Sequence, residues 1–105
     1  MKILPHWLHK WICVALIGEI YPEIRAIVVG FSEENELLIR YYLDREPIED
    51  DYDSVDMLIS EVLANTSSAS EITYYKGECI FSKEHMSELN QLDELIYASR
   101  EYSLI

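Results

Sequence analysis

The 105-residue sequence is poor in the residue types that several classes of functional site require. Its three glycines form no glycine-rich loop of the kind that cradles a phosphate or surrounds a nucleophilic serine. Its two cysteines, Cys13 and Cys79, are expected to stay unpaired, because lone cysteines in a reducing compartment are usually small buried hydrophobes. We therefore predict no enzyme, no disulfide and no cofactor.

Positive charge is also scarce. Eight Lys and Arg face 20 Asp and Glu, which gives a formal net charge of −12. This balance argues against nucleic acid as a direct ligand, because affinity for phosphates comes largely from cations, and it disfavours anionic membranes for the same reason. It favours capture of a cation-rich protein, steered over a Debye length of about 8 Å at physiological salt.

Long hydrophobic runs are missing as well. The stretch WLHKWICVALIG is interrupted by His9 and Lys10, is too short to span a bilayer, and is followed by no small-residue cleavage site. We therefore expect a cytoplasmic protein. A hydrophobic fraction of 50% and eight tyrosines exclude a disordered tail, and the length fits a single domain over residues 1–105.

The first part of the chain predicts a helix followed by a β-hairpin. Apolar residues recur every three or four positions between Leu4 and Ile20, which is helical spacing. Residues 23–31 are rich in β-branched side chains, and residues 36–45 alternate between two faces, as strands do. Because only the short polar stretch SEEN separates these strands, we expect them to pair as a hairpin.

The second part predicts another helix and two more strands. Pro47 suits the first turn of a helix that ends at Asn65. The buried stripe of this helix is predicted to consist of Tyr52, Val55, Leu58, Ile59, Val62 and Leu63. The stretch NTSSAS (65–70) predicts an exposed loop, residues 71–81 a strand, residues 82–90 a loop or one helical turn, and residues 93–102 a last strand. The predicted fold is α+β, with two helices packed on a four-stranded antiparallel sheet in the order αββαββ.

Acidic residues gather in the segment REPIEDDYDSVD, residues 45–56, which holds six carboxylates and one guanidinium. The unsatisfied N–H groups and dipole of a helix start favour negative charge by about 0.3–1 kcal/mol each, which explains Glu49, Asp50 and Asp53. The mutual repulsion of the other acids stays unexplained: Asp44, Glu46, Asp51 and Asp56. A calcium loop fits poorly, because the segment has a proline where a flexible ligand is expected and no glycine at the sharp turn.

Three soft ligands, His6, His9 and Cys13, share one face of the first predicted helix, with Cys79 and His85 as distant supplements. Zinc sites usually show tighter paired spacings, so we predict packed or solvated side chains and no metal. An acid pair such as Asp50 and Asp53 would need a desolvated member for acid–base catalysis, and an exposed helix start offers water instead. No catalytic residue is predicted.

Tyrosines occur as neighbours at Tyr41–Tyr42 and at Tyr74–Tyr75. Alternate strand positions face opposite sides of a sheet, so one member of each pair must point away from the helices. Because tyrosine is a common anchor of protein interfaces, these outward members are candidate contact residues.

Four features together resemble the small immunity proteins of bacterial contact-dependent growth inhibition systems. They are an N-terminal amphipathic helix, a hairpin ending in YYLDREP, an acidic helix opening with EDDYDSV, and a final IYASREY. The resemblance touches about half the chain and implies tight binding to the C-terminal domain of a cognate toxin, often a nuclease with a cationic substrate site.

A basic nuclease fits the acidic composition, since carboxylates mimic the phosphates that such a domain binds. The predicted toxin-binding residues are Tyr42, Asp44, Glu46, Glu49, Asp50, Asp53 and Asp56. The alternative is an acidic adaptor or a homo-oligomerising module that pairs through an exposed sheet edge. The sequence leaves the oligomeric state open.

Overall fold

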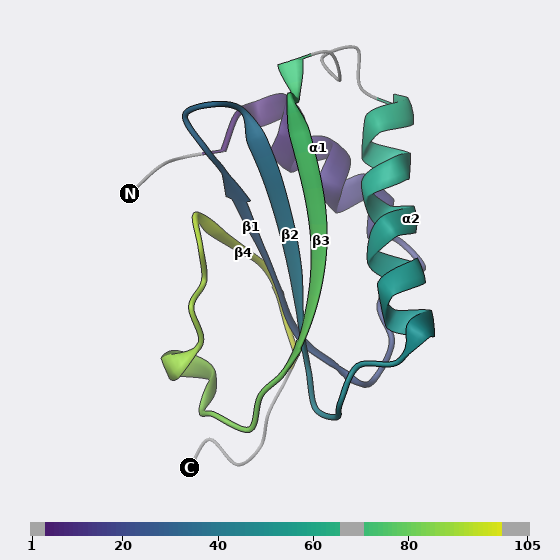
Figure 1. Cartoon of the computed structure of the whole chain (residues 1–105), viewed down its shortest axis with the longest axis vertical. Coiled ribbons are helices and arrows are strands. Elements are labelled where there is room, and N and C mark those ends of the chain that lie inside the picture. The colour runs from purple at the N-terminus through teal and green to yellow at the C-terminus, as the bar shows by residue number, and fades with distance from the viewer. Residues whose placement is uncertain (1–3, 66–70, 100–105) are drawn as a thin grey trace.

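A computed structural model describes residues 4–65 and 71–99, which form a sheet with two helices on one face (Figure 1). The elements are α1 (His6–Ala15), β1 (Ile24–Phe31), β2 (Glu36–Leu43), α2 (Glu49–Asn65), β3 (Tyr74–Phe81), the 3-10 helix η2 (Met86–Glu88) and β4 (Glu94–Ala98). This order adds to the predicted αββαββ the short η2 helix, which lies within residues 82–90, where the sequence predicts a loop or one helical turn. Residues 66–70 of the predicted NTSSAS loop, and the predicted last strand beyond residue 99, lie outside the described residues.

The sheet has the strand order β3-β2-β1-β4. The predicted hairpin is confirmed, because β1 and β2 pair antiparallel, and β4 also pairs antiparallel with β1. The prediction of a fully antiparallel sheet is wrong, since β3 runs parallel to β2. Parallel neighbours need a long crossover, and the 17-residue α2 supplies it by carrying the chain back to the end of the sheet where β2 begins.

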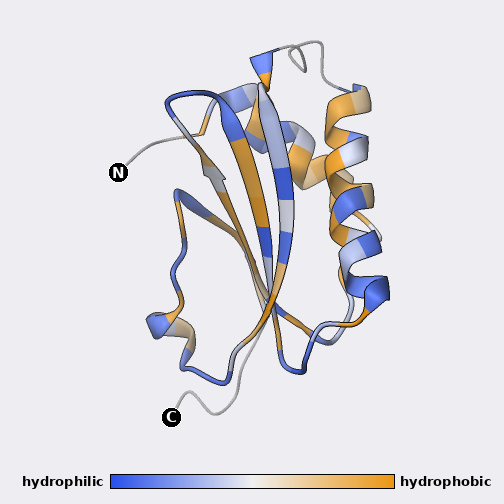
Figure 2. Cartoon of the chain, in the orientation of Figure 1, coloured by the Kyte–Doolittle hydropathy of each residue, from blue (hydrophilic) through white to orange (hydrophobic). Residues whose placement is uncertain are grey.

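The main core lies between the helices and one face of the sheet. Leu8 and Ile12 of α1 and Val55 of α2 are fully buried there, and they pack in one cluster with strand residues such as Ile39. Much of β2 is orange in Figure 2, whereas the first turn of α2 is blue. The amphipathic patterns therefore place the helices correctly, because each buries its apolar stripe on the sheet.

Helix α1 is shorter than predicted. It ends at Ala15, although helical spacing continues in the sequence to Ile20. Gly18 follows with a φ of 85°, a left-handed conformation that glycine adopts without steric cost. The chain turns there toward β1, and Ile17, which the pattern places on the apolar stripe, is left 80% exposed.

The helix-free face of the sheet carries a second, smaller cluster. Ala26, Val28 and Tyr42 are buried under Leu89 of the segment between β3 and β4. The Tyr42 hydroxyl donates a hydrogen bond of 2.8 Å to the Asn90 carbonyl oxygen. Tyr41 packs in the main core on the opposite face, so the prediction that these neighbouring tyrosines point to opposite sides is confirmed. None of the helices in residues 4–65 and 71–99 has the length and apolar character needed to cross a bilayer.

Candidate functional site

Six of the seven predicted site residues are exposed. They lie on the loop after β2 and on the outer side of the first turns of α2, and we call them the exposed acidic segment: Asp44, Glu46, Glu49, Asp50, Asp53 and Asp56. Glu49, Asp53 and Asp56 have the spacing of one helical stripe. Within residues 4–65 and 71–99, no ion pair neutralises any of the six carboxylates. This segment therefore presents concentrated negative charge to solvent.

Asp51 is the exception among the acids of α2, because its side chain is only 1% exposed. Arg45 donates to both carboxylate oxygens, from Nη1 to Oδ2 at 2.6 Å and from Nη2 to Oδ1 at 3.1 Å. The Tyr21 hydroxyl donates to Oδ1 at 2.6 Å, and the Ile48 N–H donates to Oδ2 at 2.8 Å. Asp51 thus caps the start of α2 and joins it to the segment before β1.

These contacts determine the charge state of Asp51. Burial by itself would raise the pKa of this carboxyl, but the hydrogen bonds from Arg45, Tyr21 and Ile48 more than offset burial and hold the pKa at about 2. Burial, together with the hydrogen bond that its hydroxyl donates to Asp51, raises the pKa of Tyr21 well above its ordinary value of 10.0. Asp51, whose place in the repulsive cluster the sequence left unexplained, is therefore a structural carboxylate.

Tyr42, the seventh predicted site residue, does not lie on the surface. Its side chain is 5% exposed, and its hydroxyl also accepts a hydrogen bond of 3.1 Å from Nη1 of Arg40. Arg40 in turn pairs with Glu78 of β3 at 2.8 Å. Tyr42 therefore holds the β3–β4 connection against the sheet.

Apolar side chains lie beside the exposed acids. Ile48 is 50% exposed, Tyr52 44% and Met57 58%. Tyr52 of α2 and Ile80 of β3 line a shallow cleft of about 300 Å³. The prediction that Tyr52 is buried is wrong. Helical spacing from Val55, Leu58 and Ile59 allows either position 51 or position 52 to lie on the buried stripe, and Asp51 occupies the buried position. That spacing is the signal in the sequence that could have identified both residues.

The candidate metal ligands do not converge on one site. Cys79 is buried in the main core, whereas Cys13 is exposed on α1. No group of three or more His, Cys, Asp or Glu in the described part of the chain has the geometry to hold a metal ion. His85 instead caps η2, where its imidazole accepts from the Ser87 N–H.

Cys13, His9 and Glu94 nevertheless line up in the order thiol, imidazole, carboxylate. Cys13 Sγ lies 3.6 Å from His9 Nε2, and His9 Nδ1 lies 2.7 Å from Glu94 Oε2. Partial burial and the negative charge of Glu94 raise the pKa of the Cys13 thiol above 9.0. Because the thiolate is the nucleophilic form, this shift lowers the fraction of Cys13 that is nucleophilic at neutral pH.

The sequence model of the MafI2 immunity protein family matches residues 5–101. The chain belongs to this family. A comparison with curated proteins found no match. Membership of the MafI2 family confirms the predicted class, an immunity protein of a toxin–immunity system, and it implies a cognate toxin as partner. It does not extend to contact-dependent growth inhibition, because the Maf system is related but distinct.

Proposed function

We propose that this MafI2 family member is a non-enzymatic inhibitor that acts in the cytoplasm of the producing cell and binds the C-terminal domain of its cognate toxin. The exposed acidic segment is the proposed contact surface. Family membership supports the pairing with a toxin, and the observation that carries the choice of surface is the set of six exposed carboxylates without an ion-pair partner in the described residues.

Stabilisation of the helix start accounts for only part of this charge. The helix dipole acts within the first turn, which holds Glu49 and Asp50. Asp56 lies two turns into α2, and Asp44 and Glu46 precede the helix, so the dipole offsets little of the repulsion among these carboxylates. A cationic partner would relieve that repulsion and would be steered to the segment from about one Debye length away.

The proposed toxin domain is a basic nuclease. Such a domain binds phosphates with Lys and Arg, and carboxylates spaced along a helix offer those side chains substitute anions. Tyr52 and Met57 add apolar contact area among the charges, and aromatic residues and methionine are enriched in protein interfaces. Electrostatic steering then sets the association rate, while these apolar contacts slow dissociation.

Binding kinetics with the toxin domain encoded beside the gene would test this proposal. The triple variant Glu46→Gln, Asp50→Asn, Asp53→Asn should keep the fold, slow association about tenfold at low salt, and flatten its dependence on salt. A matched control removes three exposed carboxylates elsewhere: Glu61→Gln, Glu71→Gln and Glu88→Gln. Equal association rates for the two triple variants, together with full protection of toxin-expressing cells by the first, would refute the choice of surface.

A second candidate function is self-association through β3. This strand is at the edge of the sheet, with Tyr74 58% exposed and Tyr75 53% exposed. Open strand edges can pair with a second copy of the chain. Light scattering across a range of protein concentrations would support this function if the mass doubled, and a constant monomer mass would refute it.

A further inference from the structure

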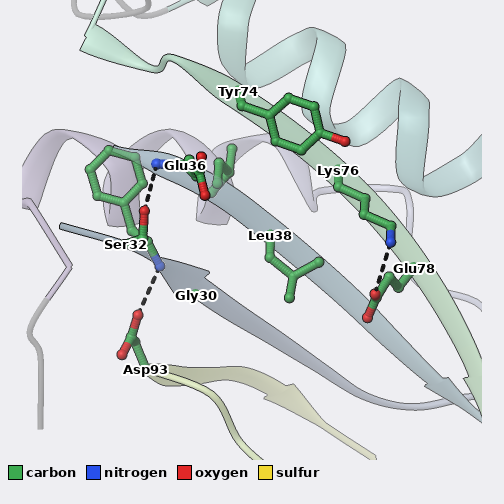
Figure 3. A pocket seen from close by; sticks show the side chains of 10 residues that line it. Gly30, Ser32, Glu36, Leu38, Tyr74, Lys76, Glu78 and Asp93 are labelled. Carbon is green, nitrogen blue, oxygen red and sulfur yellow. Dashed lines mark hydrogen bonds and ion pairs between the residues drawn. The ribbon is translucent and has the colours of Figure 1, made fainter. Parts of the chain in front are cut away.

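A pocket of about 410 Å³ opens on the helix-free face of the sheet, beside the β1–β2 turn (Figure 3). The segment between β3 and β4 covers the other end of this face, where it buries Ala26, Val28 and Tyr42. The pocket is therefore the part of the face that this segment leaves uncovered. It is separate from the exposed acidic segment, most of which lies where α2 begins, near the opposite end of β3 (Figure 1).

The strand register explains why the surface is hollow there. Gly30 of β1, Leu38 of β2 and Lys76 of β3 are paired across the sheet in one row. Gly30 contributes no side chain, so Leu38 forms an apolar floor. Figure 3 shows the Tyr74 ring and the Asp93 carboxylate on opposite sides of this floor.

Three of the described carboxylates line the pocket, and two of them, Asp93 and Glu36, keep unused acceptor capacity. Glu78 is already paired with Arg40 at 2.8 Å and with Lys76 at 3.5 Å. Asp93 accepts the Phe31 N–H through Oδ2 at 2.8 Å, and among the described residues no donor reaches its Oδ1. Glu36, which is exposed, has no side-chain partner within the same residues. The pocket thus combines an apolar floor, one aromatic wall and the free carboxylates of Glu36 and Asp93, and its one described lining cation, Lys76, is paired with Glu78.

We propose that this pocket receives an arginine side chain of the toxin domain. The inference rests on the proposed function and adds a second anchor to it. A guanidinium stacks on an aromatic ring, which fits Tyr74, and its fork of donors pairs with carboxylates, which fits Glu36 and Asp93. The aliphatic stem of the arginine would cover Leu38.

Charge complementarity favours a toxin over a second copy of this chain as the occupant. The chain has a net charge of −12, so two copies repel each other. Its described arginines are already engaged: Arg25 binds the Ser82 carbonyl oxygen, Arg40 binds Glu78, and Arg45 binds Asp51. A cation-rich toxin domain lying along β3 would reach both the pocket and the exposed acidic segment.

The rate at which variants of this chain dissociate from the toxin domain tests the pocket proposal. Tyr74→Ala and Glu36→Gln are each expected to raise the rate about tenfold, whereas Tyr74→Phe, which keeps the ring, should change it less than twofold. The chain supplies matched controls: Tyr75→Ala removes an equally exposed neighbouring ring, and Glu34→Gln removes a carboxylate that does not line the pocket. Both controls should leave the rate within twofold of the wild-type value.

Substitutions in the toxin domain identify the side chain that occupies the pocket. Exposed toxin arginines are changed singly to Ala, and one of them should weaken binding to the wild type but have no further effect on binding to the Tyr74→Ala variant. If the pocket variants bind like their controls, or no toxin arginine couples to Tyr74, the pocket proposal is overturned while toxin binding stands. If the variants change the oligomeric mass instead, a second copy is the occupant. A wild-type chain that does not bind the toxin would overturn both proposals.

Discussion

Replacing the buried Asp51 by Asn is expected to lower the free energy of unfolding by about 3 kcal/mol at neutral pH. The substitution keeps the shape of the side chain but removes its charge and turns one acceptor oxygen into a donor. Four donor atoms converge on this carboxylate: Tyr21 Oη, Arg45 Nη1 and Nη2, and the Ile48 backbone N. The new amide would face at least one of them, so a buried donor would lose its acceptor.

The magnitude follows from the pKa of this group. The pKa of the Asp51 carboxyl falls from an ordinary value of 3.8 to about 2 in the folded chain. At 1.36 kcal/mol per pKa unit, this corresponds to about 2 kcal/mol in favour of the charged form. The unsatisfied donor adds roughly 1 kcal/mol. The Asp51 side chain is only 1% exposed, so solvent screens this interaction little.

Urea unfolding followed by circular dichroism measures the effect. With a slope of about 2 kcal/mol per molar urea, the midpoint should fall by roughly 1.5 M. Asp53→Asn is the matched control, because Asp53 is exposed on the same helix and its loss should cost at most about 1 kcal/mol. Equal midpoints for the two variants would contradict the structural role of Asp51.

The pH dependence supplies an independent check. Because the folded pKa of Asp51 is depressed, its contribution is fully present above pH 3.8 and is lost as the pH falls through about 2. The wild type should therefore lose stability over this acid range, and the Asn variant should lose less. Parallel curves for wild type and variant would show that the charge of Asp51 does not stabilise the fold.

Two further predictions concern the contact between α2 and β3. Gly77→Ala should lower the free energy of unfolding by about 1–3 kcal/mol, because the new Cβ would meet Val55 Cγ1 at 2.7 Å; Gly30→Ala, whose Cβ meets its neighbours at 3.7 Å, should cost less in the same urea titration. Burial, together with the nearby charges of Asp51 and Asp56, raises the pKa of the Cys79 thiol from 9.0 to about 12. The stability that the neutral thiol contributes to the fold is therefore fully present below pH 9.0 and is lost as the pH rises toward 12. Thermal melts should show a smaller alkaline loss for Cys79→Ala than for wild type, and identical losses would contradict this.

Local patterns in the sequence determined the elements of the fold. Alternation and the short SEEN turn predicted the β1–β2 hairpin, and the spacing of Val55, Leu58, Ile59 and Val62 predicted the buried face of α2. Short motifs also led to the immunity protein class that the family match supports. These features could be predicted because hydrophobic period and turn chemistry depend on residues close together in the chain.

The tertiary structure decided which strands are neighbours and which polar residues are buried. Nothing in the period of residues 71–81 states that β3 lies parallel to β2, because alternation is the same for both directions of pairing. Asp51 differs from Asp50 and Asp53 in its burial, and the hydroxyl that helps to hold it comes from Tyr21, 30 positions away in the chain. The Tyr42 hydroxyl likewise binds the carbonyl oxygen of Asn90, 48 positions further on. Contacts over such separations form only when the whole chain packs. The sequence therefore predicted a cluster of acids, but only the fold separated Asp51, a structural carboxylate, from the carboxylates left free at the surface.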